Sequence, residues 1–356
     1  MRIHPIHVKS VFYVYSSEQA AREGHNEGAC GFLVAISKQP LGENSATGEG
    51  FIYAVTNCHV IGHILQDGGT PHIRINSDNG EPLILGVPAT AWKYHPDGDD
   101  IAIAEIDVEP PEMLYVSFPE HFVKPEYLEP NSWHIGPGDS VYMVGRFMHH
   151  DGKKINTPVV RYGNVSLNPG DGDKIYNRDT GHYDEVFLIE SRSISGYSGS
   201  PVFVYIVPYD ERNKPPEPEV HTFIVTGLTP RTRVFLLGIN IGNTSGVKPV
   251  LMEKDKKEVP FRFDDGTGLW SEYNTGIMRI APAWKIQELL DAEEFKMIRD
   301  KHSEKQKEKA EQHYKLDSEH STKDMPVISR DEFMKSLKKT ARKVNPSKSD
   351  QSKPKT

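Results

Sequence analysis

Short apolar segments dominate the first 245 residues of the chain. Most are rich in β-branched and aromatic side chains, several alternate apolar with polar residues, and Gly, Pro, Asp or Asn bound them. Such segments predict short β-strands. The predicted strands cover residues 31–36, 51–56, 72–76, 101–106, 140–145, 158–166, 185–190, 201–207, 221–228 and 233–241. Many short strands with few helical periods indicate an all-β barrel or sandwich.

A proline-rich stretch divides these strands into two groups. Proline cannot donate a ladder hydrogen bond, so we expect residues 108–137 to cross between two β units instead of pairing within a sheet. The first unit is expected at about residues 8–110 and the second at about residues 138–281. A polar, proline-rich stretch at residues 208–220 is interpreted as a surface loop.

The apolar period becomes helical towards the end of the chain. A stripe of apolar residues from Trp284 to Ile298 predicts a helix over residues 282–301. Residues 302–356 are mostly charged or polar, and such a composition buries too little apolar surface to offset the entropy of ordering, which predicts a disordered tail. Within this tail, residues 329–343 begin with a capping box and keep one apolar face, which predicts a short amphipathic helix. This helix docks on a partner or on the acidic body of the chain, or else the tail is only a solvated extension.

Charge and composition narrow the class of protein. The chain has 356 residues and 37% hydrophobic content, enough for one large or two small cores. Its net charge of −8 disfavours nucleic acid as the main partner. Residues 291–356 hold 17 Lys and Arg against 13 Asp and Glu, so the tail is basic and the body is acidic.

The same sequence gives an expectation about the compartment. No apolar run approaches the roughly 20 residues needed to span a bilayer. The run at residues 11–15 is too short for a secretory signal. The two cysteines, Cys30 and Cys58, do not suggest a disulfide framework. We therefore expect a cytoplasmic protein without a membrane partner.

The stretch SRSISGYSGSPVF, at residues 191–203, suggests chemistry. A nucleophilic serine needs a sharp turn that exposes Oγ and aims backbone N–H groups at a developing oxyanion. Gly196 and Gly199 flank Ser198, where larger side chains would crowd an incoming carbonyl group. Ser198 is therefore the candidate nucleophile, and the N–H groups of Gly196 and Ser198 are the candidate oxyanion hole. Taken alone, a stretch of serine and glycine before a strand is usually only a turn.

Two further residues supply what a serine nucleophile requires, namely a general base and a carboxylate that orients it. His59 follows an apolar segment in YAVTNCHVIG, and either Asp99 or Asp100 precedes an alternating segment in HPDGDDIAIAEI. The order His, Asp, Ser along the chain is that of the chymotrypsin architecture and differs from the order in α/β-hydrolases and subtilisins.

Together these motifs resemble those of trypsin-like peptidases, and most closely those of the HtrA (Deg) branch. TNCHVI is similar to the His motif of that family, DDIAI to its Asp motif and SGYSGSPVF to its Ser motif. The resemblance implies a peptidase domain at residues 1–285 with two six-stranded antiparallel β-barrels and no PDZ domain. It also implies a triad of His59, Asp100 and Ser198 between the barrels, with Asp100 preferred to Asp99 because it directly precedes the apolar pair.

The resemblance further implies where a substrate binds. The residues that match the specificity pocket are Arg192, Ser193, Ser195, Asn240, Ile241 and Gly242. A guanidinium group at Arg192 would favour an acidic substrate side chain. Alternatively, Arg192 points to solvent or pairs with Glu190.

Two departures from familiar patterns matter. Secreted trypsins carry Asp at the position of Tyr197, so activation by a new α-amino group is not expected here. His59 and His63 are four residues apart, which suits two metal ligands on one helix, but the Glu of an H-E-x-x-H motif is missing. His63 is therefore interpreted as an ordinary residue, and no metal or other cofactor is predicted.

The sequence thus predicts a serine endopeptidase that acts on proteins or peptides. One alternative is a trypsin-fold protein that binds a peptide, or docks partners through residues 329–343, with little turnover. Another is an esterase that uses the same triad.

Overall fold

The structure is a computed structural model that describes most of the chain. The described residues are 3–25, 28–37, 50–77, 80–108, 121–147, 152–170, 174–177, 181–191, 196–206, 233–249, 270–301 and 304. Several predicted features lie outside them: the pocket residues Arg192, Ser193 and Ser195, the loop at 208–220, the strand at 221–228, the helix at 329–343 and nearly all of the tail at 302–356. Contacts divide the chain into two compact units, Met1–Lys296 and Met297–Thr356, and every strand that the described residues form belongs to the first.

The N-terminal half folds into a seven-stranded antiparallel sheet in the order β5-β4-β1-β2-β3-β7-β6. Its strands are β1 (Val11–Tyr15), β2 (Ala29–Ser37), β3 (Gly50–Thr56), β4 (His72–Asn76), β5 (Pro82–Gly86), β6 (Trp92–Tyr94) and β7 (Ala102–Ile106). Its helices are α1 (Pro5–Lys9), α2 (Glu18–Glu23), α3 (Cys58–Gln66) and the 3-10 turn η1 (Ala89–Ala91). Val60 and Ile61 of α3 join apolar residues of the strands in one buried cluster. This packing fixes α3 on the sheet.

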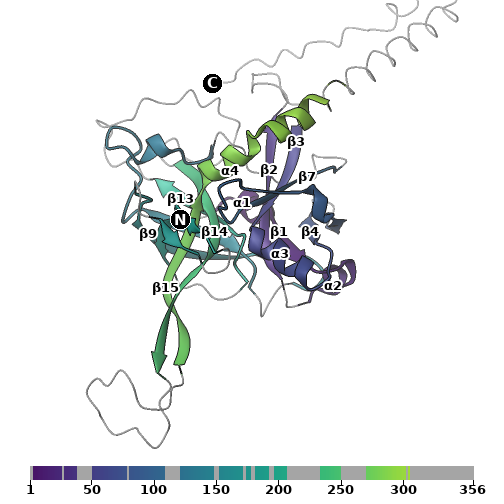
Figure 1. Cartoon of the computed structure of the whole chain (residues 1–356), viewed down its shortest axis with the longest axis horizontal. Coiled ribbons are helices and arrows are strands. Elements are labelled where there is room, and N and C mark those ends of the chain that lie inside the picture. Colours follow the sequence, from purple (N-terminus) through teal and green to yellow (C-terminus); the bar gives the residue numbers. More distant parts are fainter. Residues whose placement is uncertain are drawn as a thin grey trace, which may run out of the picture. The chain divides into compact units, whose positions relative to one another are not determined.

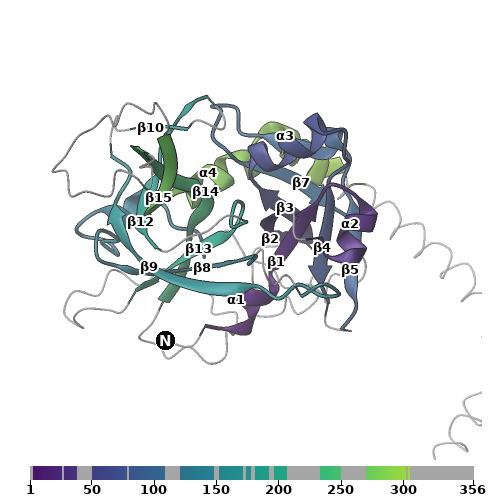
Figure 2. The ribbon, with the colours of Figure 1, turned by 90° about the horizontal axis from the view of Figure 1, so that it is seen from below.

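The C-terminal half forms a closed barrel in the order β12-β15-β14-β13-β8-β9. Its strands are β8 (Ser140–Gly145), β9 (Val159–Leu167), β12 (Phe187–Glu190), β13 (Pro201–Ile206), β14 (Arg233–Pro249) and β15 (Trp270–Pro282). β10 (Ile175–Tyr176) and β11 (Tyr183–Asp184) form a separate hairpin. Figure 1 shows the paired ends of β14 and β15 extending beyond the barrel. Figure 2 shows the barrel strands grouped on one side and β1 to β5 on the other.

Segments near both ends of the first unit connect these two halves. His7 of α1 packs edge-on against Phe203 of the barrel, with ring centroids 4.4 Å apart. After β15, helix α4 (Ala283–Leu290) places Trp284 against Phe187 of the barrel. A few residues later, Phe295 packs edge-on against Tyr53 of the sheet. Within this unit, α1, α4 and the residues after α4 therefore help to hold the barrel and the sheet together.

The predicted all-β fold with two β units is confirmed, with two differences in detail. The N-terminal unit has seven strands instead of six, because the three-residue strand β6 adds to β7 at one edge, and its described strands form a sheet that is not closed into a barrel. In the crossing segment, η4 (Pro125–Leu128) follows Phe122, which makes an isolated bridge to Leu236.

The helical prediction for residues 282–301 also changes in detail. α4 ends at Leu290, and helical residues resume at 293 after a short turn. None of the helices formed by the described residues is both long and apolar enough to cross a membrane.

Candidate active site

Ser198 lies on a tight turn directly before β13. The N–H of Ser200 donates to the carbonyl oxygen of Tyr197 at 3.1 Å, and Gly199 has a φ of 81°. This combination fits a type II turn with glycine at its third position. Gly196 also has a positive φ, of 98°. Ser198 is half-buried, so the turn leaves it in contact with solvent.

The barrel holds this turn through Asn240 and Tyr197. Asn240 Nδ2 donates to the Tyr197 carbonyl oxygen at 2.9 Å, and the backbone N–H of Asn240 donates to the Ser200 carbonyl oxygen at 2.9 Å. The carbonyl oxygen of Asn240 in turn accepts from Gly199 N–H at 3.0 Å. The Tyr197 ring is buried in the barrel core, with the Arg161 guanidinium carbon 5.0 Å from its centroid. Both ends of the turn are therefore fixed by buried contacts.

The N-terminal sheet contacts the same turn through Cys30 and Thr56. Cys30 N–H donates to the Ser198 carbonyl oxygen at 2.9 Å. Thr56 Oγ1 donates to the Cys30 carbonyl oxygen at 2.7 Å. A Cβ atom at Gly199 would lie 1.9 Å from that carbonyl oxygen and 2.7 Å from Thr56 Oγ1. Only glycine fits here, and the serine turn of the barrel therefore lies directly against strands β2 and β3 of the sheet.

His59 lies in the first turn of α3, shortly after the end of β3, and its side chain is paired with Asp100. Its Nδ1 atom lies 2.5 Å from Asp100 Oδ2, and its backbone N–H donates to Asp100 Oδ1 at 3.0 Å. Asp100 is fully buried, and the His59 side chain is 10% exposed. In the neutral tautomer that donates Nδ1–H to Asp100, the lone pair resides on Nε2. Thr56 is the last residue of β3, lies three residues before His59 and packs against Gly199. The His59–Asp100 pair and the serine turn are therefore found at the same end of β3.

Several donors surround the Asp100 carboxylate. Burial alone raises its pKa, but the hydrogen bond and charge of His59, the Cys58 thiol at 3.0 Å and the His59 backbone N–H outweigh burial, so the net pKa is lowered. Asp100 is therefore ionised at neutral pH. Burial, followed by the Asp100 charge, raises the pKa of Cys58, so this thiol stays protonated and donates. Asn57 Nδ2 fixes the backbone by donating to the Asp100 carbonyl oxygen at 2.8 Å.

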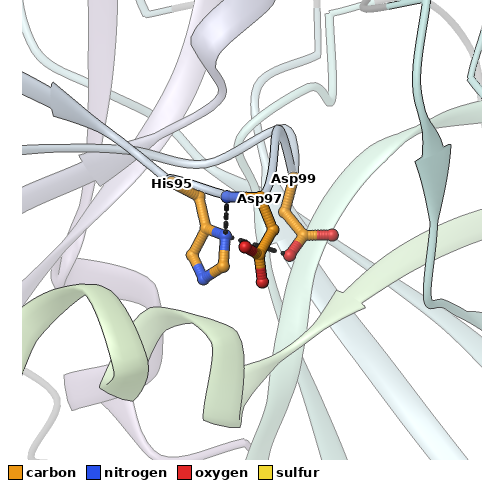
Figure 3. Close-up of side chains that lie close together, drawn as sticks. All are labelled: His95, Asp97 and Asp99. Carbon is orange, nitrogen blue, oxygen red and sulfur yellow. Dashed lines mark hydrogen bonds and ion pairs between the residues drawn. The ribbon is translucent and has the colours of Figure 1, made fainter.

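The alternative acid, Asp99, has different partners. Figure 3 shows it beside His95 and Asp97, with Asp99 Oδ2 3.1 Å from His95 Nδ1. Lys285 of α4 places Nζ 3.7 Å from the same carboxylate and 3.1 Å from Glu288. Asp99 therefore connects the loop to α4, and this geometry favours Asp100 as the partner of His59.

A cavity of about 320 Å³ lies beside His59. Its lining residues are Cys58, His59, Gly62, His63, Gln66, Tyr94, His95, Gly98, Asp99 and His182. Four histidines thus border one cavity. His182 reaches it from the segment before β11, and a Cβ atom at Gly98 would lie 3.0 Å from the His182 ring.

Of the predicted specificity residues, three fall in the described part of β14. Asn240 and Ile241 are buried, and Asn240 Oδ1 accepts from Gly242 N–H at 3.2 Å. The Asn240 side chain thus holds the serine turn, and any substrate contact of residues 240–242 would come mainly from their backbone. The sequence analysis gave no such role to Asn240, nor any to Cys30 and Thr56.

The comparisons with known proteins concern the fold. No protein-family profile matches the chain, and no curated protein matches its sequence. Its structure is similar to Deg5, at 17% identity over 66% of this chain and 79% of that chain, with a TM-score of 0.36. It is similar to the active form of the Rv3671c protease from M. tuberculosis, at 16% identity over 81% and 83% of the two chains, with a TM-score of 0.39. It is also similar to the HtrA-type protease AlgW, at 12% identity over 79% and 63% of the two chains, with a TM-score of 0.35.

These matches include the HtrA type of protease, whose motifs the sequence resembles. At such identities a likeness concerns the fold alone, and TM-scores this low carry no argument about chemistry. The side chains described above must therefore support any conclusion about function.

Proposed function

We propose that this protein is a serine endopeptidase in which His59, Asp100 and Ser198 form the catalytic triad. The observation that carries the proposal is the buried hydrogen-bonded pair of His59 and Asp100 at the end of β3. The turn that carries Ser198 lies against the same strand end. A buried carboxylate that holds a partly exposed imidazole next to a serine on a glycine turn is the arrangement that acyl transfer requires.

In the proposed mechanism, His59 acts first as a base and then as an acid. Its Nε2 atom accepts the proton of Ser198 Oγ as this oxygen attacks the substrate carbonyl carbon. The ionised Asp100 stabilises the resulting imidazolium ion, which then protonates the leaving amine. Water, deprotonated by the same imidazole, hydrolyses the acyl-enzyme and restores Ser198.

The proposed oxyanion hole consists of the N–H groups of Gly196 and Ser198. Among the described residues, neither N–H group has an acceptor in the backbone network, whereas the two carbonyl oxygens contact Cys30. Two donors without a competing acceptor suit a developing oxyanion. Gly196 has a positive φ, which glycine adopts without strain, and this supports a requirement for glycine at position 196.

The proposed substrate is a protein or peptide that binds along the cleft between barrel and sheet. Arg192, Ser193 and Ser195 belong to the proposed pocket, together with the backbone of residues 240–242. In this pocket, the Arg192 guanidinium group would favour substrates with an acidic side chain before the cleaved bond.

A fluorophosphonate probe and a peptide library test this function together. Wild type should be labelled at Ser198 and should cleave peptides. Ser198→Ala and Asp100→Asn should each lose about 10⁴-fold or more in rate, because the triad acts as one unit. Ser191→Ala and Asp99→Asn are the matched controls and should retain most of the activity.

The outcomes separate the candidate functions. Cleavage that survives Ser198→Ala would refute the proposed nucleophile. Labelled Ser198 with ester but no peptide hydrolysis would indicate an esterase. A folded protein that binds peptides but is neither labelled nor active would indicate the binding protein instead.

A further inference from the structure

We propose that the cavity beside His59 binds a divalent transition metal ion, zinc in particular, through His59 and His63. An ion at this position would also block the catalytic base. Only that inhibitory consequence rests on the proposed function, because metal binding itself needs no catalysis. The sequence alone indicates no special role for His63, but three features of the structure suit a metal site.

The first reason is the spacing of the two imidazole rings. His59 and His63 lie one turn apart on α3, and their ring centroids are 5.7 Å apart with an interplanar angle of 63°. Two imidazoles that bind one zinc ion tetrahedrally, with metal–nitrogen distances of about 2.0–2.1 Å, have ring centroids about 5.3 Å apart. A small side-chain adjustment therefore brings both rings to one ion, without moving the helix.

The second reason is the hydrogen bond that holds His59. Because its Nδ1 faces Asp100, a metal would bind His59 through Nε2. A carboxylate that accepts Nδ1–H from a histidine also raises the basicity of the other nitrogen, as in carboxylate–histidine–zinc sites. The geometry that prepares His59 to accept a proton from serine thus prepares it equally to bind a metal.

The third reason is the surrounding cavity. Its volume of about 320 Å³ has room for an ion and its waters, and a Cβ atom at Gly62, between the two histidines, would meet nothing within 4 Å. His63 is exposed, so an ion can reach it from solvent. His182 lines the same cavity, and it becomes a third ligand only if its ring moves closer to the pair. Waters would complete a tetrahedral site.

The cluster of His95, Asp97 and Asp99 is the competing site in the same region. Its three ligand atoms lie within 4.8 Å of one another (Figure 3). However, Lys285 Nζ lies 3.7 Å from the Asp99 carboxylate, so this cluster already contains a cation. The pair on α3 has no such neighbour in its cavity lining.

Binding is tested first, independently of activity. The full-length Ser198→Ala protein is stripped of metal with a chelator and titrated with zinc by calorimetry and with cobalt by absorption spectroscopy. We expect one ion per chain and a tetrahedral cobalt spectrum. His63→Ala and His63→Gln should each weaken binding at least about tenfold, since one of two or three protein ligands is lost. Gln66→Ala, on the same helix and in the same cavity, is the control and should bind as the parent does.

Inhibition is tested by probe labelling of the protein with Ser198 intact. At a free zinc concentration of about ten times the Kd, the labelling rate should fall about elevenfold, because only metal-free protein reacts. The ratio of rates without and with zinc should fall to about two or less in His63→Ala, whose Kd is at least about tenfold larger, and stay at the parent value in Gln66→Ala.

Two results would overturn the inference. One is unchanged zinc affinity in both His63 variants while their circular dichroism is native. The other is loss of binding in Asp97→Asn but not in the His63 variants, which would place the ion in the competing cluster. If zinc binds through His63 but the metal-free protein is never labelled, the metal site stands and the proposed peptidase function fails.

Discussion

Asp184 carries a buried charge that the fold does not compensate, and replacing it should stabilise the protein. This residue ends β11 and is 1% exposed. Asn177 Nδ2 donates to its Oδ2 at 2.7 Å, whereas its buried Oδ1 has no hydrogen-bond partner in the described part of the chain. The pKa of Asp184 is raised to about 6: burial is the largest cause, the charges of Asp99 and Asp100 add to it, and the hydrogen bond from Asn177 and the charge of Arg279 oppose it.

The sign of the pH dependence follows from this shift. The folded protein holds the Asp184 proton more tightly than the unfolded chain, whose value is 3.8. The stabilising contribution of the protonated form is therefore complete below the unfolded pKa and is lost as the pH rises through about 6. A shift of this size corresponds to at most about 3 kcal/mol. Asp184→Asn removes the charge and keeps an acceptor for Asn177, so the variant should be about 1–3 kcal/mol more stable than wild type at pH 8.

Urea denaturation at about pH 4.5 and pH 8 measures this effect. The advantage of Asp184→Asn should be present at pH 8 and should fall to about one third of that value at the lower pH. Asp107→Asn, at an exposed position, is the control and should show little difference at either pH. A variant that is less stable than wild type at pH 8, or an advantage that does not change with pH, would refute the assignment of a buried ionised carboxylate.

Other predictions concern the residues that hold the site. Gly199→Ala should lower the unfolding free energy by at least about 2 kcal/mol, because alanine is strained at this positive φ and its Cβ would overlap the β2 backbone. The variant should also lose probe labelling, and labelling at the wild-type rate would contradict the close contact. Asn240→Ala should lower the unfolding free energy by about 1–3 kcal/mol, because the side-chain hydrogen bond to the serine turn is lost, and it should slow probe labelling of the folded protein. Unchanged labelling would show that the turn keeps its conformation without Asn240. Because the pKa of Cys58 is raised, this thiol should react with iodoacetamide at pH 8 more than about tenfold slower than an unperturbed thiol. Rapid modification of Cys58, measured by mass spectrometry, would contradict its hydrogen bond to Asp100.

The strands that the sequence predicted well have a clear local period or clear boundaries. The strand expected at 72–76 is β4, and those expected at 51–56 and 140–145 are β3 and β8 within one residue. β6 was missed because its three residues are too few to show any period, and only its pairing with β7 makes it a strand. β1 is buried along its whole length, so it has no alternation by which to recognise it.

In the site, too, the residues within recognisable local motifs were predicted, whereas the residues that contact them from distant parts of the sequence were not. His59, Asp100 and Ser198 were proposed because each lies in a short motif with glycine or apolar neighbours. The residues that position them are far away in sequence: Cys30 contacts the turn from β2, and Asn240 contacts it from β14. No sequence pattern near either residue predicts these contacts: the Cys30 contact forms only when barrel and sheet meet, and the Asn240 contact only when β14 pairs with β13.

Asp99 and Asp100 illustrate how two identical neighbours acquire different roles. Ile101 N–H donates to the Asp99 carbonyl oxygen at 2.7 Å, so the chain turns tightly at Asp100 and the two carboxylates separate. Asp100 turns to His59, where it receives donors and stays charged, whereas Asp99 turns to His95 and Lys285. Helix α4 is therefore linked to the loop whose next residue orients the imidazole.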